Sequence, residues 1–119
     1  MIGDPLDISA EGDIVVAALR GDIDLSNAKM IANSIGEAVP NDAAGVVLDL
    51  GAVTYLDSSG VHLVFDLNER LAGRQQRLAI ALPEGSRISR VLDLVNVGAV
   101  VPIETTVDAA LGRVRAPDQ

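Results

Sequence analysis

The sequence predicts a single α/β domain over residues 1–119, in which a mixed β-sheet of about five strands packs against about four helices. Its 119 residues, 49% of them hydrophobic, suit one domain with a modest core. Tyr55 and Phe65 are the only aromatic residues, so aliphatic side chains must fill the interior, as in layered α/β proteins. Short apolar runs alternate with helical spacing after an opening hairpin, which gives the order β-β-α-β-α-β-α-β-α. We expect order from about residue 4 to 114 and a frayed tail over 115–119.

The first two strands are predicted over residues 4–9 and 13–24, and the polar, glycine-containing turn 11–13 between them indicates a hairpin. From Leu25 the apolar spacing becomes helical. The residues that fall on one face of this first predicted helix are Leu25, Ala28, Ala32 and Ile35. Asp24 or Ser26 can cap its start, and Gly36 with Pro40 marks its end.

The second half of the chain repeats a strand and helix alternation. A buried strand is predicted over 45–50, because this segment is short, apolar and rich in β-branched residues. The elements predicted after it are a helix from Val61 to near Gly73, a strand over 77–82, a short helix capped by Ser86 and reaching Asp93, a strand over 99–103 and a helix over 106–114.

Charge and composition exclude several classes of partner. The net charge is -8, from 17 acidic and 9 basic residues, and the bases are scattered along the chain. Binding to nucleic acid or to an anionic membrane surface requires concentrated positive charge, so we expect neither. No apolar run approaches the ~20 residues of a membrane span, and no signal peptide pattern opens the chain. With no cysteine and only scattered carboxylates, we predict a cytoplasmic protein without a metal or cofactor site.

The segment Asp57-Ser58-Ser59-Gly60 lies between an apolar strand and an amphipathic helix. Such a position is a helix N-terminus, where Asp57 or Ser58 can cap free backbone N–H groups. A phosphoryl group there adds roughly -1.5 to -2 charges at pH 7, which can abolish binding to a partner through repulsion and desolvation without unfolding the domain. The residues alone therefore leave two interpretations open, a simple cap and a phosphorylation switch built on that cap.

Two motifs about 30 residues apart resemble those of the STAS-domain anti-anti-sigma factors, also called anti-sigma factor antagonists. Gly21-Asp22-Ile23-Asp24 matches the Gly-Glu-Leu-Asp-like segment that precedes the first helix in that family. Asp57-Ser58-Ser59-Gly60 matches the Asp-Ser-[Ser/Thr]-Gly segment that opens the second helix. The similarity in element order extends from about residue 4 to 112.

The resemblance implies a non-enzymatic switch in bacterial transcription control. The unphosphorylated protein would bind an anti-sigma factor that is also a serine kinase, which then releases its sigma factor. The kinase would phosphorylate Ser58, with Ser59 the less favoured acceptor, and a PPM-type phosphatase would reset the switch. The residues expected to contact the partner are Asp22, Asp24, Asp57, Ser59, Gly60 and His62, with Gly60 allowing the partner's backbone to approach the serines.

His62 departs from the family pattern, which has leucine and a small residue after the motif where this chain has Val61-His62. On a helix His62 lies one turn after Ser58, on the same side. Three interpretations are open: His62 is a plain surface residue, its cation pairs with phosphoserine, or its different shape alters the choice of kinase. A Ser58/His62 hydrolase is excluded, because the chain lacks the Gly-x-Ser-x-Gly elbow and an acid to orient the histidine. The alternative function is a STAS scaffold that is never phosphorylated, or a subunit of a larger signalling or transport complex.

Overall fold

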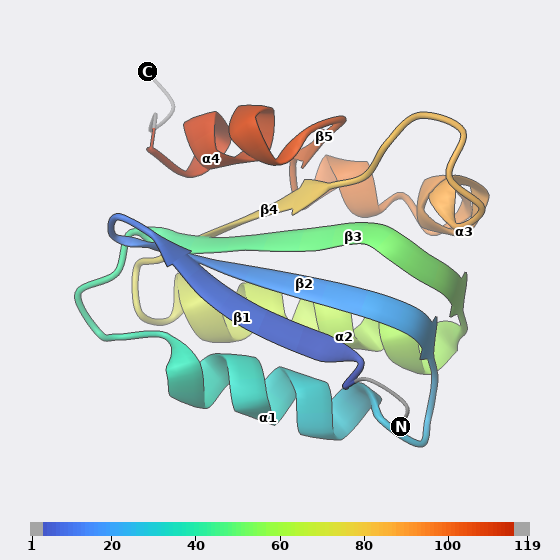
Figure 1. Cartoon of the computed structure of the whole chain (residues 1–119), viewed down its shortest axis with the longest axis horizontal. Coiled ribbons are helices and arrows are strands. Elements are labelled where there is room, and N and C mark those ends of the chain that lie inside the picture. The colour runs from blue at the N-terminus through green and yellow to red at the C-terminus, as the bar shows by residue number, and fades with distance from the viewer. Residues whose placement is uncertain (1–3, 116–119) are drawn as a thin grey trace.

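Strand β3 lies at the centre of a five-stranded sheet whose order follows the chain, β1-β2-β3-β4-β5 (Figure 1). The computed structural model describes residues 4–115. The strands are β1 (Leu6–Glu11), β2 (Ile14–Ile23), β3 (Gly45–Leu56), β4 (Arg77–Ala81) and β5 (Ile103–Glu104). The helices are α1 (Ala28–Ala38), α2 (Ser58–Ala72), α3 (Ser89–Leu94), the 3-10 helix η1 (Val97–Ala99) and α4 (Val107–Arg115). The predicted mixed sheet and element order are confirmed, since β1 and β2 are antiparallel and the other neighbours are parallel.

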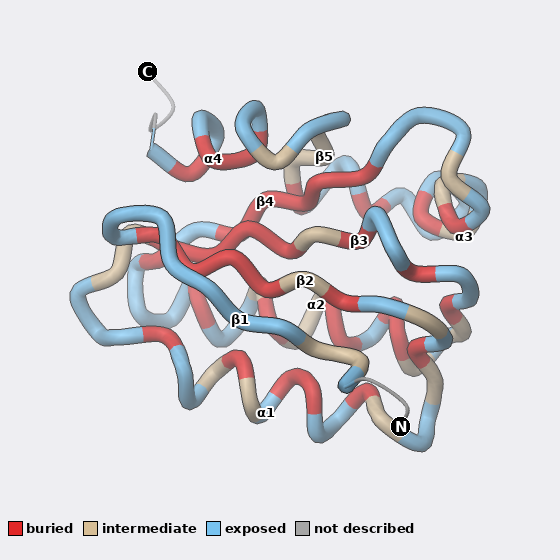
Figure 2. Tube along the Cα trace, viewed as in Figure 1, coloured by how far each residue is buried: buried red, intermediate tan, exposed pale blue. Residues whose placement is uncertain are grey.

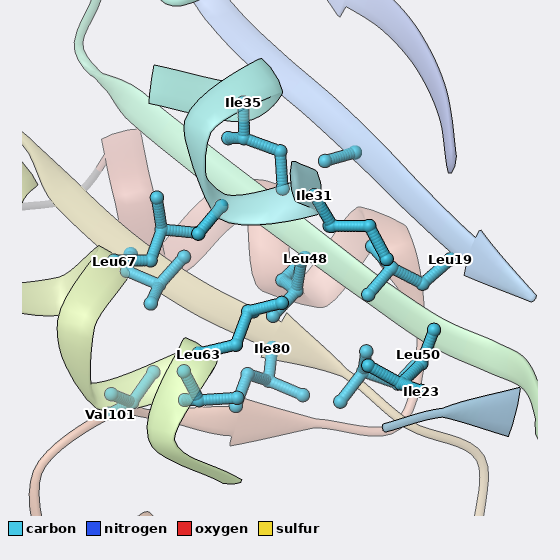
Figure 3. Close-up of a cluster of buried hydrophobic side chains, with 14 of the residues drawn as sticks. Leu19, Ile23, Ile31, Ile35, Leu48, Leu50, Leu63, Leu67, Ile80 and Val101 are labelled. Atoms are coloured by element: carbon cyan, nitrogen blue, oxygen red, sulfur yellow. The ribbon is translucent and has the colours of Figure 1, made fainter. Parts of the chain in front are cut away.

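Helices cover the two faces of the sheet unequally. Helices α1 and α2 lie side by side against one face, and α4 packs on the other face against β3 and β4 (Figure 1). The larger core fills the space between the sheet and α1 with α2, where Ile31 and Ile35 meet Leu48 (Figure 3). Burial is concentrated in β2, β3 and β4, while the edge strand β1 is mostly exposed (Figure 2). Helices α1 and α2 pack against each other and form the outer layer on this face of the sheet.

Strand β3 is longer than the sequence predicts. It continues past residue 50 to Leu56, although several of its later residues are exposed. The first half pairs with both β2 and β4, whereas beyond Asp49 it pairs with β2 alone. A strand segment with one neighbouring strand and partly exposed side chains does not need a continuous apolar sequence. The apolar pattern therefore failed to reveal the extension from residue 51 to Leu56.

The start and end of α1 also differ from the prediction. Leu25 does not belong to the buried face of this helix: it precedes Ala28, and its side chain is 82% exposed. The reason is a turn over residues 24–27, in which the Asp24 carbonyl accepts the backbone N–H of Ala28 at 2.9 Å. Gly36 does not end the helix, which continues to Ala38; an added Cβ on Gly36 would lie 3.2 Å from Arg70 Nη1.

The C-terminal third follows the predicted order with shifted boundaries. The strand expected over 99–103 is reduced to β5, because Val97–Ala99 forms a 3-10 turn. Ser86 accepts only a long 3.4 Å hydrogen bond from the Ile88 N–H, and α3 begins later, at Ser89. Helix α4 begins at Val107, one residue after the predicted start, and the Thr106 hydroxyl accepts the Ala109 N–H at 3.1 Å. Arg115 ends α4 instead of starting a tail, and the rest of the expected tail lies outside the described residues.

Candidate functional site at the start of helix α2

The two sequence motifs lie side by side at one end of the sheet. The register of β2 and β3 pairs Ile23 with Leu56, so the first motif ends β2 where the second motif directly follows β3. The Asp57 N–H then donates to the Ile23 carbonyl at 3.3 Å. The loop before α1 and the first turn of α2 are therefore held together by the backbone of the sheet.

Asp57 caps helix α2. Its carboxylate accepts the backbone N–H of Ser59 at 2.8 Å and that of Gly60 at 3.2 Å, which satisfies two of the free donors at the helix start. The sequence left Asp57 and Ser58 as alternative caps, and the structure assigns the role to Asp57. Ser58 is left exposed at the first position of the helix, and Ser59 is partly buried.

Asp24 organises the loop that faces this helix start. Its carboxylate accepts both the backbone N–H, at 2.9 Å, and the hydroxyl of Ser26. These two hydrogen bonds, with the hydroxyl bond the larger cause, hold the pKa of Asp24 below its ordinary value. Asn27 closes the loop, because it accepts the Asp24 N–H at 3.0 Å and donates to the Asp22 carbonyl at 2.9 Å.

Asp22 lies at the end of β2 with an exposed side chain. The hydroxyl of Thr54 on β3 donates to its carboxylate at 3.0 Å. Asp22, Asp24 and Asp57 therefore each have at least one hydrogen bond that fixes their carboxylate at this end of the sheet. We call these three residues the acidic rim; of them, Asp57 directly precedes Ser58 in the chain.

Gly60 has an internal role that the sequence did not indicate. An added Cβ would overlap the side chain of Leu56, reaching 2.8 Å from its Cγ, and would lie 3.2 Å from the Ile23 carbonyl oxygen. Gly60 is buried and does not have a positive φ, so space and not backbone conformation explains the glycine. Packing inside the domain therefore accounts for the glycine, and the expected approach of a partner's backbone stays a prediction.

Ser58, Ser59 and His62 line a groove of about 620 Å³ between α1 and α2, which we call the α1–α2 groove. Its other lining residues are Leu25, Ala28, Lys29, Ala32, Leu63, Asp66 and Arg70. The buried lining residues Ala28, Ala32 and Leu63 form an apolar floor, and the remaining residues are polar or charged apart from the exposed Leu25. Of the predicted partner residues, Ser59 and His62 line the groove. The three acids of the acidic rim do not line it, and neither does the buried Gly60.

One side of the groove has a signal in the sequence. Ser58, His62, Asp66 and Arg70 recur at intervals of four residues, which places them along one ridge of α2. Leu25 and Lys29 line the other side of the groove, from the loop before α1 and from α1 itself. The sequence has no comparable signal for them, and the helical spacing wrongly predicted that Leu25 is buried. Within residues 4–115 no cluster of three or more His, Asp or Glu residues could hold a metal ion, and no helix is long and apolar enough to cross a membrane.

The sequence matches the STAS domain family over residues 6–110, a span that includes both motifs and every strand. The chain belongs to the STAS domain family. This STAS domain is 27% identical over 108 residues to the anti-sigma-F factor antagonist RsfB of Mycobacterium tuberculosis, covering 91% of this chain and 87% of RsfB.

Solved structures share the fold of this STAS domain. An anti-sigma factor antagonist from Mycobacterium paratuberculosis superimposes with a TM-score of 0.81 at 24% identity, covering 93% of each chain. The phosphorylated form of the Bacillus cell fate determinant SpoIIAA superimposes with a TM-score of 0.65 at 25% identity, covering 92% of this chain and 99% of SpoIIAA.

Proposed function

We propose that this STAS domain is an anti-sigma factor antagonist that acts by binding and not by catalysis. Its unphosphorylated form binds an anti-sigma factor serine kinase in the cytoplasm and frees the sigma factor. Phosphorylation of Ser58 ends this binding, and a PPM-type serine phosphatase restores it. The observation that carries the proposal is the exposed Ser58 directly after the capping residue Asp57, in a chain of this family.

Exposure and hydrogen bonding favour Ser58 over Ser59 as the phosphoacceptor. The Ser58 side chain is exposed, and no hydrogen bond involves its hydroxyl within the described residues. Ser59 is partly buried, and its backbone N–H is engaged by Asp57. A kinase must bring the acceptor hydroxyl in line with a nucleotide, and Ser58 can present its hydroxyl without breaking the cap.

The arrangement explains how a phosphoryl group could change binding and preserve the fold. The added charge of roughly -1.5 to -2 at pH 7 would appear at the positive end of the α2 dipole, on a side chain that supports no packing. It would also appear directly after Asp57, whose carboxylate carries a like charge. A partner that docks here would meet a new charge that must be desolvated, so its affinity falls.

The known relatives support the same function. RsfB is named as an antagonist of an anti-sigma-F factor, and SpoIIAA has a structure in a phosphorylated form. For this chain we expect the partner surface to combine the acidic rim of Asp22, Asp24 and Asp57 with Ser59 and His62 in the α1–α2 groove. Gly60 would contribute through the packing that sets the start of α2.

Intact-mass analysis tests the proposal, using the protein purified from its native cells and after incubation with the serine kinases of that host. The proposal predicts the mass of one added phosphoryl group, mapped to Ser58 and lost in Ser58→Ala. Ser59→Ala is the matched control and should still be modified. A protein that stays unmodified with every host kinase would support the alternative of a STAS scaffold or complex subunit, in which the motif serves only as a cap.

A further inference from the structure

The α1–α2 groove differs in charge from the rest of the molecule. The chain has a net charge of -8, yet the groove is lined by Lys29, His62 and Arg70 against a single acid, Asp66. Asp66 is already paired, because Arg70 Nε lies 3.0 Å from its carboxylate. The groove is therefore a local region of positive charge on an acidic protein when His62 is protonated, and its potential favours an anion.

Lys29 and His62 are the basic residues of the groove that remain available. Arg70 is occupied by Asp66 and also donates to Asn33 on α1 at 3.0 Å. By contrast, neither Lys29 nor His62 forms a hydrogen bond or ion pair with another described residue. Both side chains are exposed, so they can reorient toward a new charge without loss of an existing contact.

Ser58 lines the α1–α2 groove together with these two basic residues. His62 follows it by one helical turn on the same ridge of α2, where side chains four residues apart have their Cβ atoms ~5–6 Å from one another. Lys29 lines the same groove from α1. A tetrahedral phosphoryl group with three acceptor oxygens can receive one donor from each side at once.

We propose that Lys29 and His62 bind the phosphoryl group of phosphorylated Ser58 and hold it across the α1–α2 groove. This inference rests on the proposed function, because it requires a phosphoryl group at Ser58. The modified side chain then covers the apolar floor at Ala28 and Leu63, so the groove is blocked in addition to being made more negative. In the phosphorylated protein, which no longer binds the kinase, the groove is thus occupied by the phosphoserine side chain. Lys29 and His62 position that side chain.

The charges around phosphorylated Ser58 oppose one another, and this opposition makes the proposal measurable. Asp57 and Asp24 lie near the helix start and favour protonation of the phosphoryl group, whereas Lys29 and His62 favour its dianion. Asp66 contributes little because Arg70 neutralises it. Removal of Lys29 or His62 should therefore raise the second pKa of the phosphoserine.

The experiment installs phosphoserine at position 58 during translation and follows its second ionisation by phosphorus NMR. The variants are Lys29→Gln and His62→Gln, and the matched control is Arg90→Gln, which removes one positive charge from an exposed residue of α3 outside the groove. We expect Lys29→Gln and His62→Gln each to raise the proton affinity of the phosphoryl group roughly twofold to fivefold. Arg90→Gln should leave it unchanged, and Lys29→Arg should restore the value of the unmodified sequence.

The arrangement is overturned if either glutamine variant titrates like Arg90→Gln. Circular dichroism of each phosphorylated variant checks that the fold is retained, and the exposed positions of both side chains make loss of folding unexpected. Because phosphoserine is installed without a kinase, this titration is independent of whether a host kinase binds or modifies the protein. Failure of the proposed function would appear in the kinase assay, and failure of this inference would appear only in the titration.

Discussion

The Asp57 carboxylate accepts the backbone N–H of Ser59 at 2.8 Å and thereby caps α2 without using the hydroxyl of Ser58. The residue that supports the helix and the residue that we propose to be modified are thus adjacent but separate. A phosphorylation switch built this way can change its surface charge while its structural cap stays in place.

This separation predicts different effects for substitutions at the two positions. Asp57→Ala should lower the free energy of unfolding by about 0.5–2 kcal/mol, because the N–H groups of Ser59 and Gly60 lose their acceptor. Asp57→Asn should retain most of the stability, since asparagine is also a good cap. Ser58→Ala should change it far less than Asp57→Ala. Urea unfolding measures all three, and equal losses at the two positions would contradict the assignment of the cap.

Gly60→Ala should destabilise the domain by about 1–3 kcal/mol, because the new methyl group overlaps Leu56 and forces the start of α2 to shift. Gly112→Ala is the matched control, since nothing lies within 4 Å of a Cβ added there in α4. That substitution should stabilise the protein by about 0.5–1 kcal/mol through helix propensity. Thermal or urea unfolding should therefore give opposite signs for the same chemical change.

The Ser26 hydroxyl should control the acid titration of Asp24. Ser26→Ala removes the main cause of its lowered pKa, so the pKa should rise toward the ordinary aspartate value. A depressed carboxyl pKa stabilises the folded state above the unfolded-state pKa, and this contribution disappears as the pH falls through the folded-state pKa. The stability difference between the two proteins should therefore be present at pH 6 and shrink below about pH 4. Carboxyl NMR titration checks the shift, with Ser34→Ala as a control whose hydroxyl contacts no acid.

Leu25→Ala should weaken binding to the anti-sigma factor kinase and leave the fold unchanged. The Leu25 side chain is 82% exposed and lines the α1–α2 groove beside Ser58, so it can be buried only by a partner. We expect about a tenfold loss of affinity, as for an apolar anchor at an interface. Leu94→Ala removes another exposed leucine, 76% exposed at the end of α3, and should bind like the unmodified sequence. Equal affinity of the two variants would place Leu25 outside the interface.

The regular alternation of strands and helices was predictable, because the central strands are apolar and the helices carry one buried face. The extension of β3 to Leu56 was not, since that half of the strand has only β2 beside it and carries exposed residues. Leu25 was misplaced because apolar spacing cannot reveal that the Asp24 turn delays the start of α1.

The motif residues of the site were found in the sequence, and their neighbours were not. Asp57 and Ser58 stand out as polar residues between two apolar segments, so their position at a helix start could be inferred. Lys29 faces them only because α1 and α2 pack side by side, which no local pattern reports. The internal need for Gly60 depends likewise on Leu56 and on the Ile23 carbonyl, which approach it through the fold.

The most direct test of the central claim is calorimetric titration of the host's anti-sigma factor kinases with two forms of this protein, unmodified and carrying phosphoserine at position 58. We predict that one kinase binds the unmodified form and that the modified form has lost at least about tenfold in affinity, equivalent to 1.4 kcal/mol. Equal affinity for both forms would contradict the phosphorylation switch.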